Sequence, residues 1–286
     1  MRILMIGATG RLGQPVARAL AEAGFEVTAY VRDLAKARKV LPAGVRLVEG
    51  NLRQPAKLAA AMDGQQALYL NLSVAQDERP NDWHAEEQGL AAALEAAQAA
   101  RVGRVVYLSS LIHRWEALGG TDWWVFALKR RAVATIWASG LPYTIFYPSA
   151  FMEALLMARR GKGVGVVGQS EVKLHYIAGA DYGQMVARSL RLDLTGNHDY
   201  DVQGPEGMTQ LEAATCFVAA YKKEKLKVDK VPLAVLKVIG LVDRKARFGY
   251  NLLKSLNEYP ERFASEAAWE RLGKPTTTLE QFARGL

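Results

Sequence analysis

Short apolar runs alternate with amphipathic helical stretches through the first half of the chain. Runs of this length, bounded by turn residues, are typical of buried strands. The strands that this pattern predicts cover residues 3–6, 27–31, 45–48, 67–72, 104–108 and 143–146. A helical stretch with Val16, Leu20 and Ala23 on one face follows the first strand, and the later predicted helices cover residues 34–40, 55–62, 83–100 and 123–139. Because parallel strands need crossover helices, the alternation predicts an α/β fold with a doubly wound, Rossmann-like parallel sheet.

A glycine-rich turn joins the first predicted strand to the first predicted helix. It reads Gly-Ala-Thr-Gly-Arg-Leu-Gly over residues 7–13, a G-x-x-G-x-x-G form of the dinucleotide-binding turn in the strand–turn–helix context that this motif needs. We expect Gly7 to permit the tight turn, Gly10 to let the backbone approach a pyrophosphate, and Gly13 to let the helix pack close to the sheet. The backbone N–H groups at the helix start would then face the phosphates. The predicted cofactor contacts in this turn are Gly7, Thr9, Gly10, Arg11, Leu12 and Gly13.

The end of the second predicted strand bears on which dinucleotide is bound. Arg32 stands where an NADP-binding protein places the reader of the 2′-phosphate, and Arg11 could join it. Asp33 follows directly and could instead take the ribose hydroxyls of NAD. We favour NADP and keep NAD as the alternative.

Ligands of open α/β sheets collect beyond the carboxyl ends of the strands. Residues that follow the predicted strands should therefore meet in one cleft, although they are scattered along the chain. Besides the glycine turn and Arg32, we expect cofactor contacts from Asn51, Leu52, Asn71, Leu72, Ser73, Ser109, Tyr147, Pro148 and Ser149.

The pattern changes after residue 150. Residues 151–157 predict a short apolar helix, and the Gly- and Val-rich stretch 161–168 predicts an extended loop or hairpin. A strand and a helix follow, with Asp181 expected as the helix cap, and a further strand, turn and helix occupy residues 200–226. Thr278 and Gln281 have capping-box spacing before the last helix. We therefore divide the chain into a dinucleotide-binding core, residues 1–150, and a smaller, mainly helical substrate-covering region, residues 151–286, interleaved with that core.

Composition narrows the functional classes. The chain has 286 residues, a net charge of +8 and one cysteine, Cys216, which excludes an internal disulfide and favours a cytoplasmic protein. No apolar segment approaches the ~20 residues of a membrane span, so we expect no membrane partner. The basic stretch 221–227 lacks the interleaved aromatic residues of a single-strand binding groove, so we expect no nucleic-acid partner either. The four histidines lack the spacing of metal ligands, so we expect no metal.

Several motifs together resemble the NmrA-like group of atypical short-chain dehydrogenases/reductases. They are the glycine turn, Val-Arg-Asp at 31–33, Gly-Asn-Leu at 50–52, Leu-Ser-Ser at 108–110, Lys129, Ser-Gly-Leu-Pro-Tyr-Thr at 139–144 with Pro148, Ala-Asp at 180–181, and the closing Gly-Lys-Pro at 273–275 with Thr-Leu-Glu-Gln-Phe at 278–282. The resemblance covers nearly the whole chain and implies that Lys129 lies near the nicotinamide ribose.

One departure from that family concerns the proton donor. Classical members use Tyr-x-x-x-Lys, but Val125 stands four residues before Lys129. A carbonyl reductase needs a proton donor beside the hydride acceptor, and the remaining candidates are Lys129, Tyr147 and Ser109. The absent tyrosine and the aromatic residues Trp115, Trp123, Trp124 and Phe126 favour a small flat acceptor such as a quinone, or a carbonyl.

Two functional hypotheses follow. The first is an NADP(H)-dependent oxidoreductase acting on a small molecule, with Lys129 and Tyr147 as its catalytic residues. The second is a non-catalytic NAD(P)-binding redox sensor that acts through a protein partner. Either form is expected to be a monomer or a homodimer.

Overall fold

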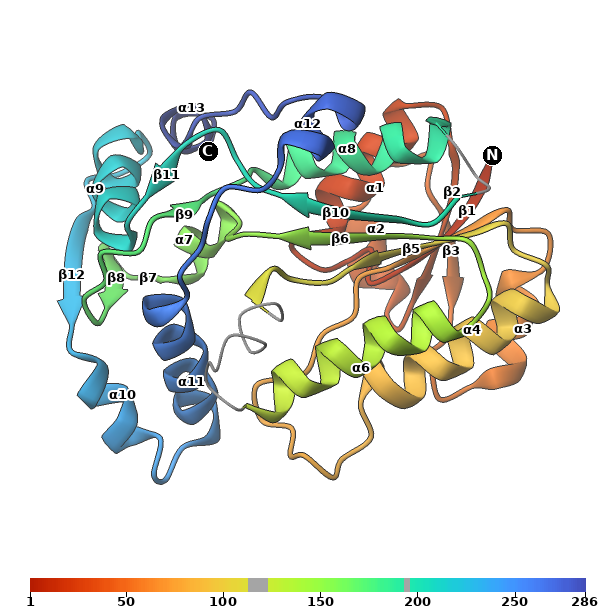
Figure 1. The fold of residues 1–286 in the computed structure, drawn as a ribbon, viewed down its shortest axis with the longest axis horizontal. Helices are drawn as coiled ribbons and strands as arrows, with labels where there is room; N and C mark the ends of the chain where they lie inside the picture. Colours follow the sequence, from red (N-terminus) through yellow and green to blue (C-terminus); the bar gives the residue numbers. More distant parts are fainter. Residues whose placement is uncertain (113–122, 193–195) are drawn as a thin grey trace.

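A single parallel sheet organises the molecule (Figure 1). The structure, a computed structural model, describes residues 1–112, 123–192 and 196–286. In that part of the chain seven strands form the sheet in the order β10-β6-β5-β4-β1-β2-β3. They are β1 (Arg2–Ile6), β2 (Glu26–Val31), β3 (Arg46–Glu49), β4 (Ala67–Leu70), β5 (Arg104–Leu108), β6 (Tyr143–Pro148) and β10 (His198–Val202). The order reverses at β1, which lies between β2 and β4.

Helices cover both faces of the sheet, because alternate residues of each strand point to opposite faces. Leu4 and Ile6 of β1 enter a core shared with α3 (Pro55–Met62), α4 (Leu90–Ala99) and α6 (Trp124–Ala138). Ile3 and Met5 enter the opposite core, with α1 (Gly13–Glu22), α2 (Leu34–Val40), α8 (Gly179–Leu192) and α12 (Glu266–Leu272). A π-helical turn, η1 (Ala85–Gly89), precedes α4. These layers confirm the predicted doubly wound fold.

The second half of the chain contributes to the same layers and adds smaller elements at the carboxyl ends of the strands. A three-stranded sheet contains β7 (Arg159–Arg160), β8 (Gly163–Val167) and β12 (Lys227–Val231), and β9 (Leu174–His175) pairs with β11 (Gly207–Met208). The remaining helices are α7 (Glu153–Met157), α9 (Gln210–Ala220), α10 (Leu233–Ile239), α11 (Arg244–Glu258) and α13 (Leu279–Arg284). Since β10 completes the main sheet and α8 packs on α1, this half is interleaved with the first.

Several local predictions need correction. Strand β4 ends at Leu70 rather than at residue 72, and the helix predicted over residues 83–100 consists of η1 followed by α4. Asp181 does not cap α8: the helix begins at Gly179, and the Asp181 carboxylate accepts the backbone N–H groups of Thr276 and Thr277 at 3.1 and 2.9 Å. Strand β6 continues through Pro148 rather than ending at residue 146, because β10 pairs alongside it up to Val202. The capping box of Thr278 and Gln281 is confirmed.

A buried carboxylate fastens the segment between α11 and α12 to the carboxyl ends of β6 and β10. The Glu261 side chain is 1% exposed. It accepts hydrogen bonds from the Ser149 hydroxyl at 2.8 Å, the His175 backbone N–H at 3.1 Å and the Gln203 side-chain amide at 2.7 Å. These bonds hold the segment across the edge of the sheet at which a ligand is expected.

We predict that Glu261→Ala lowers the free energy of unfolding by about 2–4 kcal/mol, because several buried donors lose their acceptor at once. Glu258→Ala is the matched control, since Glu258 lies three residues earlier and forms an exposed ion pair with Lys254; its cost should stay within about 0.5 kcal/mol. Urea denaturation measures both. Equal losses in the two variants would contradict the anchoring role of Glu261.

Candidate active site

The glycine turn lies at the reversal point of the sheet, directly after β1. Gly7 has φ +87°, and a Cβ built on it would lie 2.1 Å from the carbonyl oxygen of Asn71, the residue that follows β4. A Cβ on Gly13 would lie 2.1 Å from the carbonyl oxygen of Gly7. Both glycines are therefore required by close backbone packing, which brings Asn71 and the turn together as predicted. Gly10 is exposed, and its N–H donates to the Gly7 carbonyl at 3.1 Å.

The start of α1 suits a phosphate group. Its N-cap residue is Leu12, whose side chain has no acceptor, so no side chain caps the first N–H groups of the helix. The Gln14 side-chain amide instead braces the turn by donating to the carbonyl of Thr9 at 3.1 Å. A ten-residue helix that follows a glycine-rich turn, with no side chain capping its N-terminus, suits the pyrophosphate of a dinucleotide.

At the end of β2 the Arg32 side chain extends into solvent, whereas the Asp33 side chain is hydrogen-bonded to the next helix. The Arg32 side chain is exposed beyond the strand. Asp33 is the N-cap of α2, and its Oδ1 accepts the Lys36 backbone N–H at 2.9 Å. One oxygen of the Asp33 carboxylate is thus used to cap a helix, and the exposed Arg32 guanidinium beside it suits a 2′-phosphate.

Arg11, the second basic candidate, is also exposed and lies near Glu153 of α7. Burial raises the pKa of Glu153, and hydrogen bonding by the Gly179 N–H and the nearby positive charge of Arg11 oppose that rise. The glycine turn therefore faces an element of the second half of the chain.

The residues after β3 and β4 line the same edge. The Asn51 carbonyl accepts the Tyr30 hydroxyl at 3.0 Å. Leu52 packs so close to the start of α4 that a Cβ on Gly89 would lie 2.8 Å from its side chain. Leu72 is buried, and Ser73 is exposed.

Lys129 lies at this edge in a charged cluster. Its ammonium group forms an ion pair with Oε1 of Glu86 and donates to the Leu72 carbonyl at 3.3 Å. The Glu86 side chain is fully buried, and the Tyr107 hydroxyl donates to the same Oε1 at 3.4 Å. Burial, followed by the charge of Glu86, raises the pKa of Tyr107 well above its usual value, so this phenol stays neutral. The cluster therefore holds the Lys129 ammonium, paired with the Glu86 carboxylate, beside the Leu72 carbonyl two residues past β4.

Sequence reasoning missed Glu86 and Tyr107. Glu86 shares a helical face with Leu90, Ala93 and Ala97, all of them buried. A carboxylate on an otherwise apolar face was the available signal, because a buried charge requires a partner.

Two further observations concern the proton donor. Val125, which replaces the family's tyrosine, is 7% exposed and packs in the apolar core. The Ser109 hydroxyl is buried and has no hydrogen-bond partner in the described part of the chain. An orphaned hydroxyl after β5 is consistent with a ligand at this edge.

Tyr147, Pro148 and Ser149 are engaged within the protein. The Tyr147 hydroxyl donates to Asp199 Oδ1 at 2.5 Å. Asp199 pairs with Ile145, so this hydroxyl points back along β6, away from its carboxyl end. The Pro148 carbonyl accepts the Leu111 N–H at 3.0 Å, and the Ser149 hydroxyl donates to Glu261. This geometry does not favour Tyr147 as a proton donor at the cleft. Trp115, which was expected to flank the acceptor, lies outside the described residues.

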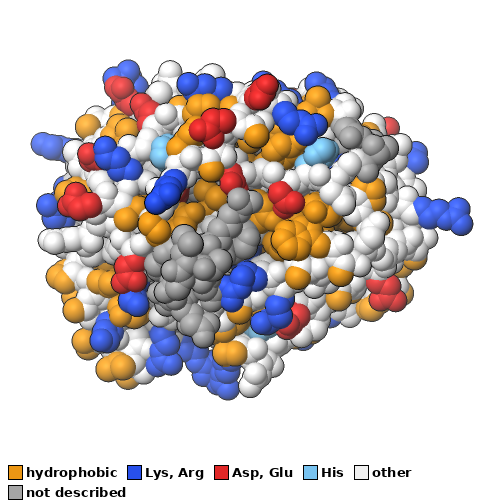
Figure 2. All heavy atoms as spheres, in the orientation of Figure 1, with side chains coloured by type: hydrophobic (Ala, Val, Ile, Leu, Met, Phe, Trp, Pro, Cys, Tyr) orange, Lys and Arg blue, Asp and Glu red, His pale blue; other side chains and the backbone are white. Residues whose placement is uncertain are grey.

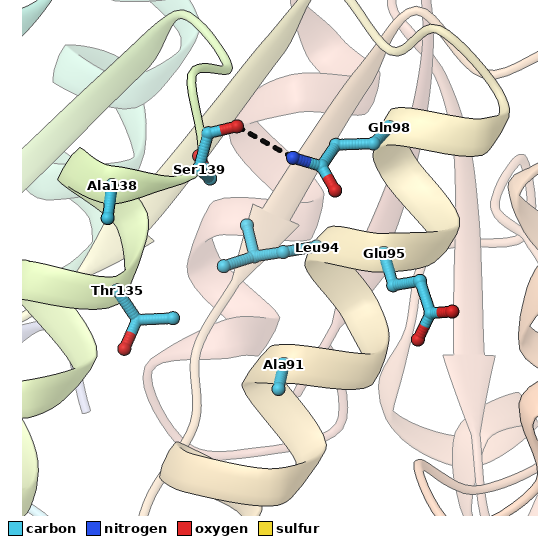
Figure 3. A pocket seen from close by; sticks show the side chains of 7 residues that line it. All are labelled: Ala91, Leu94, Glu95, Gln98, Thr135, Ala138 and Ser139. Atoms are coloured by element: carbon cyan, nitrogen blue, oxygen red, sulfur yellow. Dashed lines mark hydrogen bonds between the residues drawn. The ribbon is translucent and has the colours of Figure 1, made fainter.

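A separate cavity of about 280 Å³ lies between α4 and α6 (Figure 3). Figure 3 shows the Gln98 amide spanning the two helices to the Ser139 carbonyl, a bond of 2.6 Å. No basic side chain lines this cavity, so it does not compete with the glycine turn as a phosphate site. Among the described residues no group of three or more His, Cys, Asp or Glu side chains is arranged to hold a metal ion.

Comparison with known proteins identifies the family. A family described as NAD(P)H-binding matches residues 7–192. The chain therefore belongs to this NAD(P)H-binding family, in agreement with the resemblance drawn from its motifs.

Particular relatives carry more specific names. An NAD(P)H azoreductase of Xenophilus azovorans is 30% identical over 221 residues, 76% of this chain and 73% of that protein. The photosystem II assembly factor Ycf39 of Cyanophora paradoxa is 26% identical over 267 residues, 90% of this chain and 79% of that protein.

Solved structures share the fold. The NADPH complex of the quinone oxidoreductase QOR2 of Escherichia coli has a TM-score of 0.77 and 21% identity, covering 99% of each chain. The NADP(H) complex of the triphenylmethane reductase of a Citrobacter species has a TM-score of 0.77 and 18% identity, covering 100% of each chain.

We predict that Arg32→Glu weakens NADPH binding roughly thirtyfold, because a charge-assisted contact to the 2′-phosphate is replaced by repulsion. NADH binding should change little. Arg38→Glu, an exposed change on the neighbouring helix α2, is the control for net charge. Fluorescence titration of the unmodified protein and both variants with NADPH and NADH measures these affinities. An equal effect of Arg32→Glu on NADPH and NADH would refute the assigned role.

Proposed function

We propose that this chain is an NADP(H)-dependent oxidoreductase that reduces a small conjugated acceptor such as a quinone, or a carbonyl compound. The observation that carries the proposal is the Lys129 ammonium, which the buried Glu86 carboxylate holds beside the Leu72 carbonyl. Leu72 follows Asn71, whose carbonyl packs against Gly7, and on that basis we place this cation on the glycine-turn side of the cleft. The described edge thus combines a phosphate cradle with an anchored positive charge.

NADPH, when bound, supplies a hydride. In this proposal Gly7, Thr9, Gly10, Leu12 and Gly13 hold its pyrophosphate through the backbone. Arg32, with Arg11, binds the 2′-phosphate, while Oδ1 of Asp33 caps α2. Asn51, Leu52, Asn71, Leu72, Ser73 and Ser109 line the remaining cleft, and Lys129 binds the nicotinamide ribose.

A conjugated acceptor suits the proton chemistry of the site. Val125 offers no hydroxyl, and the Tyr147 hydroxyl is directed to Asp199. A quinone or an azo compound is protonated readily from water after reduction, whereas an isolated ketone needs an acid held beside it. The relatives named azoreductase, quinone oxidoreductase and triphenylmethane reductase support the same acceptor class. We further propose that the protein is cytoplasmic and is a monomer or a homodimer.

A redox sensor without turnover is the second candidate. The absent tyrosine favours it, and the relatives named photosystem II assembly factor point weakly the same way. Incubating the protein with NADPH and a panel of quinones, azo dyes and carbonyl compounds separates the two functions. Oxidation of NADPH with an acceptor supports the reductase. Tight NADPH binding with no oxidation across the panel would contradict the reductase and leave the sensor.

We predict that Glu86→Gln lowers kcat/KM for NADPH oxidation roughly tenfold, because the Lys129 ammonium loses its charge-assisted partner. Glu87→Gln is a closely matched control, since Glu87 is the next residue and pairs with Arg131 on the surface at 3.0 Å. Because Glu86 acts through Lys129, the double variant Glu86→Gln/Lys129→Met should be no worse than Lys129→Met alone. Additive losses in that cycle would show that Glu86 acts independently.

A further inference from the structure

The corner between α10 and α11 carries an unusual concentration of exposed apolar side chains. Val238, Leu241 and Val242 are 65%, 72% and 91% exposed, and Val235 and Ile239 are 42% and 45% exposed. These five account for most of the large exposed apolar side chains in the described residues. We call residues 235–242 the apolar corner. Exposed aliphatic groups gathered in this way mark an interaction surface, whereas scattered ones do not.

Basic residues surround the apolar corner. Between residues 230 and 247 the sequence holds five basic residues and one acidic residue, Asp243. Lys230, Lys237, Arg244 and Lys245 are exposed, and none of them forms an ion pair in the described structure. Asp243 is occupied as the N-cap of α11, where its Oδ1 accepts the Ala246 N–H at 2.6 Å. The corner therefore presents apolar groups within positive charge.

The position of two of these charges is not explained by helix stability. Arg244 and Lys245 stand in the first turn of α11, where the helix dipole disfavours cations. The backbone of the corner is also braced: the Arg247 guanidinium donates to the carbonyls of Gly240 and Leu241 at 2.7 and 3.0 Å. The corner therefore has a braced backbone and carries two cations that the helix dipole disfavours. This combination indicates that the corner binds another molecule.

The apolar corner lies at the end of the molecule toward which the strands point. In Figure 1 the arrowheads of β6 and β10 face the side that holds α9, α10 and α11. Figure 2 shows apolar and basic side chains together at the lower left of the same view, where Figure 1 places α10 and the start of α11. The corner thus stands on the side of the molecule that carries the candidate active site.

We propose that the apolar corner docks the protein on an anionic membrane surface. Aliphatic side chains flanked by Lys and Arg fit the boundary between acyl chains and negatively charged headgroups, because the two contributions add. Docking needs no spanning element: α10 has seven residues, and no helix in the described ranges has the length and apolar character to cross a bilayer. The prediction of no membrane partner was based only on the lack of a membrane-spanning segment, which surface docking does not require.

A second copy of the chain fits this surface less well. Two corners pressed together would bring Arg244 and Lys245 of each copy against like charges, which disfavours a self-complementary contact. The corner also has exposed aliphatic groups at its tip rather than the aromatic side chains that stack on single-stranded nucleic acid.

The test is co-sedimentation of the full chain with phosphatidylcholine vesicles that contain or lack 30% phosphatidylglycerol (about that share gives a clear negative surface). The full chain should bind the anionic vesicles and not the neutral ones. Leu241→Asp/Val242→Asp should abolish binding, and Arg244→Glu/Lys245→Glu should weaken it roughly tenfold or more. Leu192→Asp is the control, since Leu192 is 54% exposed at the end of α8.

The charge variant also separates docking from folding. Glutamate in the first turn of α11 is favourable to the helix, so loss of binding in Arg244→Glu/Lys245→Glu is not a consequence of unfolding. Absence of binding to anionic vesicles, or equal binding by all variants, would overturn the proposal. Self-association of the full chain that Leu241→Asp/Val242→Asp removes would assign the corner to a second copy and overturn it as well. None of these outcomes depends on NADPH turnover, so the docking and reductase proposals fail separately.

Discussion

The close backbone approach at Gly7 and Gly13 is the constraint on which the rest of the site depends. Side-chain atoms at either position would overlap carbonyl oxygens of Asn71 or Gly7. Their absence lets β1, the turn and α1 pack tightly at the reversal point of the sheet. A similar close contact joins α8 to α1, because a Cβ on Gly183 of α8 would lie 2.9 Å from the Pro15 carbonyl of α1. The glycines at positions 7, 13 and 183 thus allow the close packing of the turn on β4 and of α8 on α1, which joins the second half of the chain to the first.

Two buried carboxylates, Glu86 and Glu261, position other groups near the carboxyl ends of the strands. Glu86 is buried, and Lys129 and Tyr107 offset part of the cost of that burial by converging on its Oε1, while Oε2 has no hydrogen-bond partner in the described part of the chain. The ammonium is thereby held at the Leu72 carbonyl while Tyr107 remains neutral. Glu261 has a structural role of the same kind, as a buried carboxylate that accepts hydrogen bonds from several donors. The Glu86 cluster lies at β4 and β5, and Glu261 lies at the ends of the next two strands of the sheet, β6 and β10.

Local signals in the sequence were sufficient for most of the fold. Helices 34–40 and 55–62 and strand 104–108 have the predicted bounds, because caps, Pro55 and uninterrupted apolar runs define them locally. Interactions distant in sequence were not predictable. Asp181 has the residue type of a cap but binds Thr276 and Thr277, and Tyr147 follows an apolar run but turns back to Asp199. Glu86 escaped notice because its partners, Lys129 and Tyr107, come from two other elements.

The central claim is that the glycine turn and Arg32 form a site for a 2′-phosphorylated dinucleotide. Calorimetric titration of the unmodified protein with NADPH, NADP+, NADH and NAD+ in parallel tests it most directly. The structure predicts binding of all four through the shared pyrophosphate, with the two phosphorylated forms roughly thirtyfold tighter. Equal affinities would contradict the assigned role of Arg32, and failure to bind any of the four would contradict the account as a whole.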